Sequence, residues 1–203
     1  MAAWSTFYPD LLPHVPGVAE PMADQELRRA AQEFFRFTKA WRQWLGNITL
    51  TGAASYTVAL PTDALVHRFD RATVNGQPVA LPGWSGFDAD PESVPGQGQG
   101  FTTRDRITVV PASAYSGGVL KLRAVLVPAD QAATLPDELV AQFRDAIVAG
   151  AKARLMLQPG KGYSSPALGG VARSDFVDAM GTAQHQALKD FGADVPRPRI
   201  RDC

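Results

Sequence analysis

The chain has 203 residues, of which 45% are hydrophobic and 20% charged, so its composition is that of a folded globular protein and excludes wholesale disorder. Twenty basic residues balance twenty acidic ones, which removes the global positive field typical of a protein that grips nucleic acid by its phosphates. We therefore expect a compact domain with an elaboration, and no tight binding of DNA.

Targeting signals and cysteine chemistry are predicted to be absent. The most apolar stretch, Val119 to Val127, is interrupted by Lys121 and Arg123 and is far shorter than the ~20 residues that cross a bilayer. The first residues lack the basic start and apolar core of a secretory signal, so we expect a protein without a membrane span that stays in the cytoplasm of the cell that makes it. Because Cys203 is the only cysteine, neither a disulfide within the chain nor a thiolate metal cage is possible.

The first segment, Trp4 to Pro21, contains four prolines among aromatic and leucine residues. Prolines interrupt helices, so this pattern predicts an extended arm that lies on a surface. Its aromatic side chains are expected to dock on a neighbouring subunit, with Trp4, Phe7 and Tyr8 as the contacts.

A helical spacing of apolar residues follows, from an N-cap at Asp24 to a stop at Gly46. This spacing predicts a buried side made of Phe34, Phe37, Trp41 and Leu45. The aromatic residues interleave with arginines, as in proteins that stack on nucleic-acid bases, but helical periodicity favours core packing. Phe35 and Trp44 fall off the buried side and become candidates for a subunit contact, where aromatic residues are enriched.

From Asn47 the apolar period changes to two, which predicts strands. The expected strands are Ile48 to Thr51, Tyr56 to Leu60, Leu65 to Val74, Ile107 to Val110 and Val119 to Val127. Asn75 and Gly76 tolerate positive φ and predict a tight hairpin between Arg71–Val74 and Pro78–Leu81. Residues 82–100 are rich in proline and glycine and predict a long loop, in which Trp84 and Phe87 are further candidates for subunit contacts.

Two helices are expected after Pro128. The first begins at Pro136 with Asp137 and Glu138 in its first turn, and its small residues predict close approach of another backbone: Ala146, Ala149, Gly150 and Ala153. The second is expected from an N-cap at Ser174 to a stop at Gly192, with an apolar side that includes Phe176, Val177, Met180, Ala183, Ala187, Leu188 and Phe191. The chain ends in PRPRIRDC, which predicts an extended and locally basic arm.

The order of elements predicts an α+β fold, because the strands are grouped between helices and do not alternate with them. Residues 1–46 and 128–203 are expected to form a helical bundle of about three main helices with extended terminal arms. Residues 47–127 are expected to form an inserted antiparallel sheet or sandwich that carries the long loop 82–100.

Residues that could support catalysis or metal binding are scattered. His14, His67 and His185 show no ligand spacing, and the glycines of the long loop precede neither a helix nor a Lys-Ser/Thr pair. Ser85 lacks the complete nucleophile elbow. The alternating acids of the loop lack the glycine and distal glutamate of a calcium loop: Asp88, Asp90 and Glu92. We therefore predict no enzyme activity, no cofactor and no metal site.

Several segments resemble a family of head-to-tail adaptors of tailed bacteriophages that is related to the tubular tail proteins of short-tailed phages. The resemblance covers nearly the whole chain and departs after Leu157, where QPGKGYSSP stands in place of a Pro-Trp element. None of its motifs is a catalytic signature. They are WSTFYPDLLPHVPG, ADQELRRAAQEFFRFTKAWR, YTVALPTD, VNG, LKLRAVLVP and LPDELVAQFRDAIVAGAKARL.

This resemblance implies a structural protein of the virion neck, made in the cytoplasm of the host bacterium. About twelve copies would form a closed ring between the portal protein and a tail stopper or tail tube protein, with DNA passing through the lumen without sequence-specific binding. The C-terminal arm, 195–203, resembles adaptor tails that insert into the portal. Its expected portal-binding residues are Arg197, Arg199, Ile200 and Arg201, whose guanidinium groups would pair with acidic groups.

Two other classes stay open on the sequence alone. A tail-tube or host- and carbohydrate-binding β module would use the sheet as a sandwich and Trp84 to stack on sugar. A hydrolase would need Ser85, His67 and either Asp70 or Asp88 within hydrogen-bond reach of one another.

Overall fold

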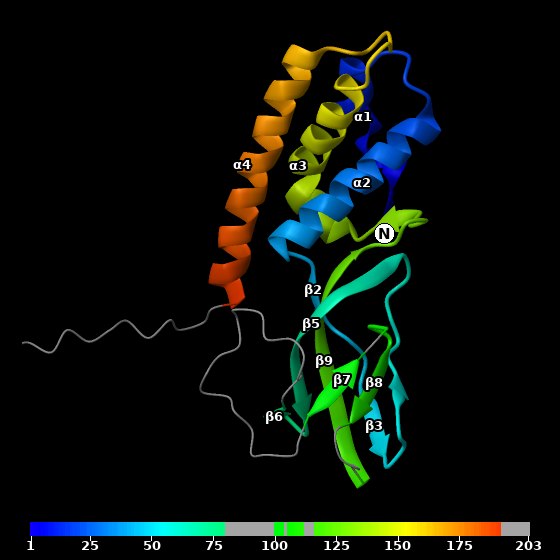
Figure 1. Cartoon of the computed structure of the whole chain (residues 1–203), viewed down its shortest axis with the longest axis vertical. Coiled ribbons are helices and arrows are strands. Elements are labelled where there is room, and N and C mark those ends of the chain that lie inside the picture. The colour runs from blue at the N-terminus through cyan, green and yellow to red at the C-terminus, as the bar shows by residue number, and fades with distance from the viewer. Residues whose placement is uncertain (80–99, 104, 112–115, 192–203) are drawn as a thin grey trace, which may run out of the picture. The chain divides into compact units, whose positions relative to one another are not determined.

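A computed structural model of the chain describes residues 1–79, 100–103, 105–111 and 116–191 (Figure 1). The chain divides into two compact units. The sheet unit comprises Met1 and Trp41–Leu135, and the helical unit comprises Ala2–Ala40 and Pro136–Cys203. The α+β class is confirmed, with helices formed by both ends of the sequence and antiparallel strands grouped between them. The middle unit begins six residues before the expected position 47 and ends eight residues after 127.

The N-terminal segment is not the extended arm that its prolines predict. After the short strand β1 (Ala2–Ala3), it forms three helical turns, η1 (Trp4–Phe7), α1 (Tyr8–Leu11) and η2 (Leu12–His14). Pro9 and Pro13 stand at the first or second position of their turns, where the missing N–H leaves no hydrogen bond unmade. Four apolar residues of this segment, spaced three or four residues apart as on one side of a helix, are buried in the helical unit: Trp4, Phe7, Leu11 and Val15.

Helix α2 spans Glu20–Thr38, so both predicted boundaries are wrong. Asp24 lies inside the helix, where its carboxylate accepts a hydrogen bond of 2.8 Å from the Tyr8 hydroxyl. The helix ends early because Lys39 takes a left-handed conformation and the Thr38 hydroxyl donates to the Phe34 carbonyl. With the helix ending there, Phe35 packs in the core and Phe37 is half exposed, the reverse of the predicted faces.

Helices α3 (Asp137–Met156) and α4 (Pro166–Phe191) complete the helical unit. The start of α3 is confirmed, whereas α4 begins eight residues before the predicted cap at Ser174. In Figure 1, α3 lies between α2 and α4, and it contacts both of them. Four phenylalanine rings from the three helices form the centre of the core, with centroid separations between 5.0 and 6.3 Å: Phe34, Phe35, Phe143 and Phe176.

Gly150 confirms the predicted close approach on α3. A β-carbon at this position would lie 2.8 Å from the Phe176 ring and 3.0 Å from the β-carbon of Ala30. The absence of a side chain therefore lets α2 and α4 pack closely on the same turn of α3.

Gly150→Ala should destabilise the protein although alanine is the better helix former. Overpacking against the fixed Phe176 ring costs about 1–3 kcal/mol, which outweighs the helix-propensity gain of about 1 kcal/mol. Gly181→Ala in α4 is the matched control, since a β-carbon there meets nothing within 4 Å. Urea unfolding should show a loss of stability for the first variant and a gain of about 0.5–1 kcal/mol for the second.

The sheet unit contains two antiparallel sheets. The larger has the order β2-β9-β5-β6, and β3 also pairs with β9; the smaller has the order β4-β8-β7. The five predicted strands are all present; the first, Ile48–Thr51, has the predicted bounds, and the other four have shifted ends. The strands are β2 (Arg42–Trp44), β3 (Ile48–Thr51), β4 (Tyr56–Thr57), β5 (Ala64–Val74), β6 (Gln77–Pro78), β7 (Phe101–Thr103), β8 (Thr108–Pro111), β9 (Ser116–Pro128) and β10 (Thr134–Leu135).

Local chemistry accounts for the turns of this unit. Asn75 and Gly76 have φ values of 51° and 84° and form the predicted hairpin, in which Val74 pairs with Gln77. The Tyr56 hydroxyl lies 3.0–3.1 Å from the backbone N–H groups of Thr51, Gly52 and Ala53, and so organises the turn between β3 and β4. Residues 82–99 of the predicted long loop lie outside the described residues.

Candidate functional site

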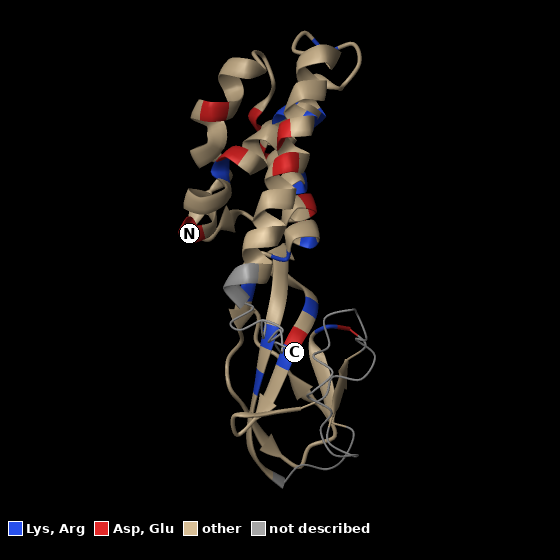
Figure 2. Ribbon diagram, turned by 90° about the vertical axis from the view of Figure 1, so that its left-hand side faces the viewer, with Lys and Arg blue, Asp and Glu red and all other residues tan. Residues whose placement is uncertain are grey.

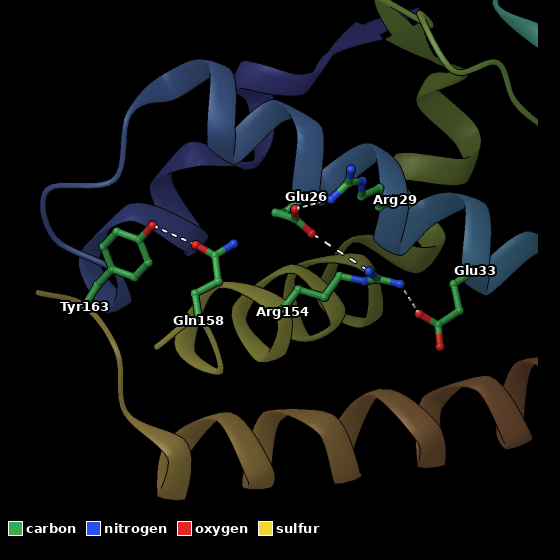
Figure 3. A network of polar contacts seen from close by, with 6 residues as sticks. All are labelled: Glu26, Arg29, Glu33, Arg154, Gln158 and Tyr163. Carbon is green, nitrogen blue, oxygen red and sulfur yellow. Dashed lines mark hydrogen bonds and ion pairs between the residues drawn. The ribbon is translucent and has the colours of Figure 1, made fainter. Parts of the chain in front are cut away.

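A polar network joins the three long helices of the helical unit, and Figure 3 shows its contacts between α2 and α3. Arg154 of α3 lies 2.6 Å from Glu33 and 3.9 Å from Glu26, both on α2. Glu26 also pairs with Arg29 at 2.8 Å, and the second oxygen of Glu33 is 2.8 Å from Arg173 of α4. Since the Glu26 side chain is only 4% exposed, its pairing is needed to offset the cost of burying a carboxylate. The network therefore has a structural role, which is to hold α2, α3 and α4 together.

The network makes stability depend on pH through Glu33. Burial alone would raise the pKa of Glu33, but hydrogen bonds from Arg173 and Arg154 outweigh it, so its pKa lies below its ordinary value of 4.5. A carboxylate with a lowered pKa stabilises the fold above the pKa of the unfolded chain, and this contribution is lost as the pH falls through the folded pKa.

We therefore expect the free energy of unfolding of the wild type to fall as the pH decreases below about 4.5. Glu33→Gln keeps the shape of the side chain but removes the titration, so its stability should be lower at neutral pH and should depend less on pH in that range. Urea unfolding at a series of pH values measures the difference. Parallel curves for the two proteins would contradict the assignment.

A cavity of about 530 Å³ lies in the helical unit among α1, η2, α3 and α4. Asp10, Asp145, Asp175, His14 and Lys152 contribute its ionisable groups, and most other lining residues are alanines. The Asp10 carboxylate pairs with Arg144. Burial lowers the pKa of Lys152, against the opposing effect of Asp10 and Asp145. The lining residues include no hydroxyl or thiol, so the cavity lacks the Ser, Thr or Cys nucleophile of a triad.

Helix α4 carries large aliphatic side chains outside its buried stripe. The buried stripe consists of Ala172, Phe176, Met180, Ala183 and Ala187. Four aliphatic residues of α4 are between 47% and 59% exposed, and they form two edges on either side of this stripe: Leu168 with Val171, and Val177 with Leu188. Val177 and Leu188 were predicted on the apolar side of this helix together with the buried residues, and the structure corrects this, because both are about half exposed. Because large exposed aliphatic groups gather at interaction sites, these two edges are the candidate functional surface.

The predicted subunit contacts differ in how exposed their side chains are. Trp4, Phe7 and Phe35 are at most 3% exposed and belong to the core of the helical unit, so the prediction of a subunit contact is wrong for these three. Tyr8 is partly exposed, and its pKa is raised by burial and by its hydrogen bond to Asp24. Trp44 is 47% exposed on β2, as a contact residue requires. The other predicted site residues lie outside the described residues: Trp84, Phe87, Arg197, Arg199, Ile200 and Arg201.

The described residues hold no group of three or more His, Cys, Asp or Glu side chains that could bind a metal ion. His67 and Asp70 lie on β5, whereas Ser85 and Asp88 of the hydrolase hypothesis are outside the described part of the chain. None of the described helices has an apolar segment long enough to span a membrane. Searches with family models and among curated proteins found no match to this chain.

Proposed function

We propose that this chain is a non-enzymatic structural subunit of the neck of a tailed bacteriophage. Copies of it form a ring between the portal and the tail, through which DNA passes. The proposal rests on the resemblance of the segments quoted above. The structural observation that supports it best is the pair of exposed aliphatic edges on α4.

A closed ring requires two different contact surfaces on each subunit, and the two edges of α4 can provide them. A cyclic ring uses heterologous contacts, so every copy must offer two different surfaces, one to each neighbour. The two edges of α4 point to different sides of one helix that is 26 residues long, or about 39 Å. These four side chains are already about half buried, so covering the rest would contribute about half of the roughly 1.5–3 kcal/mol that full burial of such a side chain gives.

The N-terminal segment no longer supports the proposal, because it packs within its own unit. The contact with the portal is assigned, as predicted from the sequence, to residues 195–203, through the forked hydrogen bonds of Arg197, Arg199 and Arg201 to acidic groups. Deletion of 195–203 should therefore abolish attachment to the portal and leave ring formation intact.

Sedimentation velocity on wild type and charge variants tests the ring. Val177→Asp combined with Leu188→Asp should convert a closed ring of one size into monomers. Thr182→Asp combined with His185→Asp adds the same charges to exposed positions of the same helix and should leave the ring unchanged. Circular dichroism confirms that both variants fold. A wild type that stays monomeric at every concentration, with or without the portal, would refute the proposal.

A further inference from the structure

The register of the larger sheet gathers basic side chains on one of its faces. Directly opposed residues of antiparallel strands lie on the same face. Arg123 of β9 is opposite Trp44 of β2 and opposite Arg71 of β5, and Lys121 is two residues before Arg123 on the same strand. Arg42 and Arg68 are both opposite Val125, again on this face. We call it the basic face: Arg42, Trp44, Arg68, Arg71, Lys121 and Arg123.

Two irregularities in β5 create this arrangement. The register shifts between Val66 and Arg68 and again between Phe69 and Arg71. Each shift inserts one residue, so that Arg68 and Arg71 lie on one face although they are three residues apart, while the opposite face keeps Phe69 and Ala72 in the core.

The basic face carries five positive side chains, and two of them, Arg42 and Arg123, are only 7% and 12% exposed and pair with Asp70. The carboxylate of Asp70 accepts hydrogen bonds of 2.8 and 2.9 Å from Arg123 and lies 3.5 Å from Arg42. Arg71 and Lys121 remain exposed, and the Arg123 guanidinium lies 5.8 Å from the ring centroid of the exposed Trp44. Figure 2 shows Lys and Arg following one another along these strands, although the chain as a whole has no net charge.

We propose that the basic face binds the sugar-phosphate backbone of double-stranded DNA through its exposed cations, Arg71 and Lys121. Arginine and lysine neutralise phosphates without reading bases, so the contact is independent of sequence and weak enough to break as the DNA moves. This assignment deepens the proposed function and rests on it for the identity of the polyanion, because a ring that conducts DNA presents that polymer to its subunits.

Fluorescence anisotropy with a labelled 30-base-pair duplex tests the assignment. At about 50 mM salt the wild type should bind the duplex, and binding should weaken steeply as salt rises to about 200 mM. Arg71→Glu combined with Lys121→Glu should weaken binding by at least about tenfold and reduce the salt slope by about 2. Arg36→Glu combined with Lys161→Glu makes the same change of charge at exposed positions of the helical unit and should change the affinity by less than about threefold.

Three results would overturn the assignment. They are no binding by the wild type at about 50 mM salt, an equal loss in the two double variants, and equally tight binding of poly-glutamate at matched charge, which would point to an acidic protein partner. Sedimentation velocity on the same samples measures ring formation independently of DNA binding. If the wild type forms rings but does not bind the duplex, only the basic-face assignment is refuted. If it binds the duplex but does not form rings, only the proposed function is refuted.

Discussion

Phe34→Ala should destabilise the helical unit by about 3–5 kcal/mol, which is a large part of the stability of a small domain. Phe34 is fully buried, and its ring lies 5.0 Å from Phe143 of α3, 5.3 Å from Phe35 of α2 and 6.3 Å from Phe176 of α4. Truncation therefore removes contacts to all three long helices at once and leaves a cavity that rigid aromatic neighbours fill poorly.

Phe37→Ala is the matched control, since it is the same change on the same helix at a side chain that is 50% exposed. It should cost less than about 1 kcal/mol. Urea unfolding followed by circular dichroism compares the two. Similar losses for both variants would mean that the helical unit does not depend on this aromatic cluster.

Asp70→Ala should destabilise the sheet unit by about 3–5 kcal/mol, because it leaves buried charges without their counter-charge. The side chains of Arg42, Asp70 and Arg123 are only 7%, 10% and 12% exposed. Hydrogen exchange of the β9 amides measures the loss locally, since β9 is the central strand of the larger sheet.

A second variant separates the charge effect from packing. In a background carrying Arg42→Met and Arg123→Met, the charges that Asp70 pairs with are gone, so Asp70→Ala should cost much less. An unchanged cost in that background would show that Asp70 acts through its shape or backbone geometry, and not through its pairing with the two arginines.

Much of the fold follows from local rules. Strands β5 and β9, the hairpin at Asn75 and the start of α3 were predicted because alternation, positive φ and a first-turn acid pair are local signals. The N-terminal segment was predicted wrongly because its prolines were counted as helix breakers. Pro9 and Pro13 stand at the starts of helical turns, where they are tolerated, and Trp4, Phe7 and Leu11 have helical spacing.

The candidate surfaces depend on information that periodicity does not carry. Phe35 and Phe37 exchange roles because α2 ends at Thr38 and not at Gly46, so the apolar pattern was read across a boundary. Val177 and Leu188 have the spacing of core residues, but α4 buries only a narrow stripe that runs through Ala172, Phe176, Met180, Ala183 and Ala187. The basic face depends on two register shifts in β5, and a net charge of zero conceals how the charges are distributed.

Electron-microscope images of the purified wild type, alone and mixed with the portal protein, would show whether this chain assembles into rings. We predict closed rings of one copy number with a central opening, and stacking of these rings on the portal. Particles that stay single protomers in both preparations would contradict the central claim that this chain works as a member of a ring.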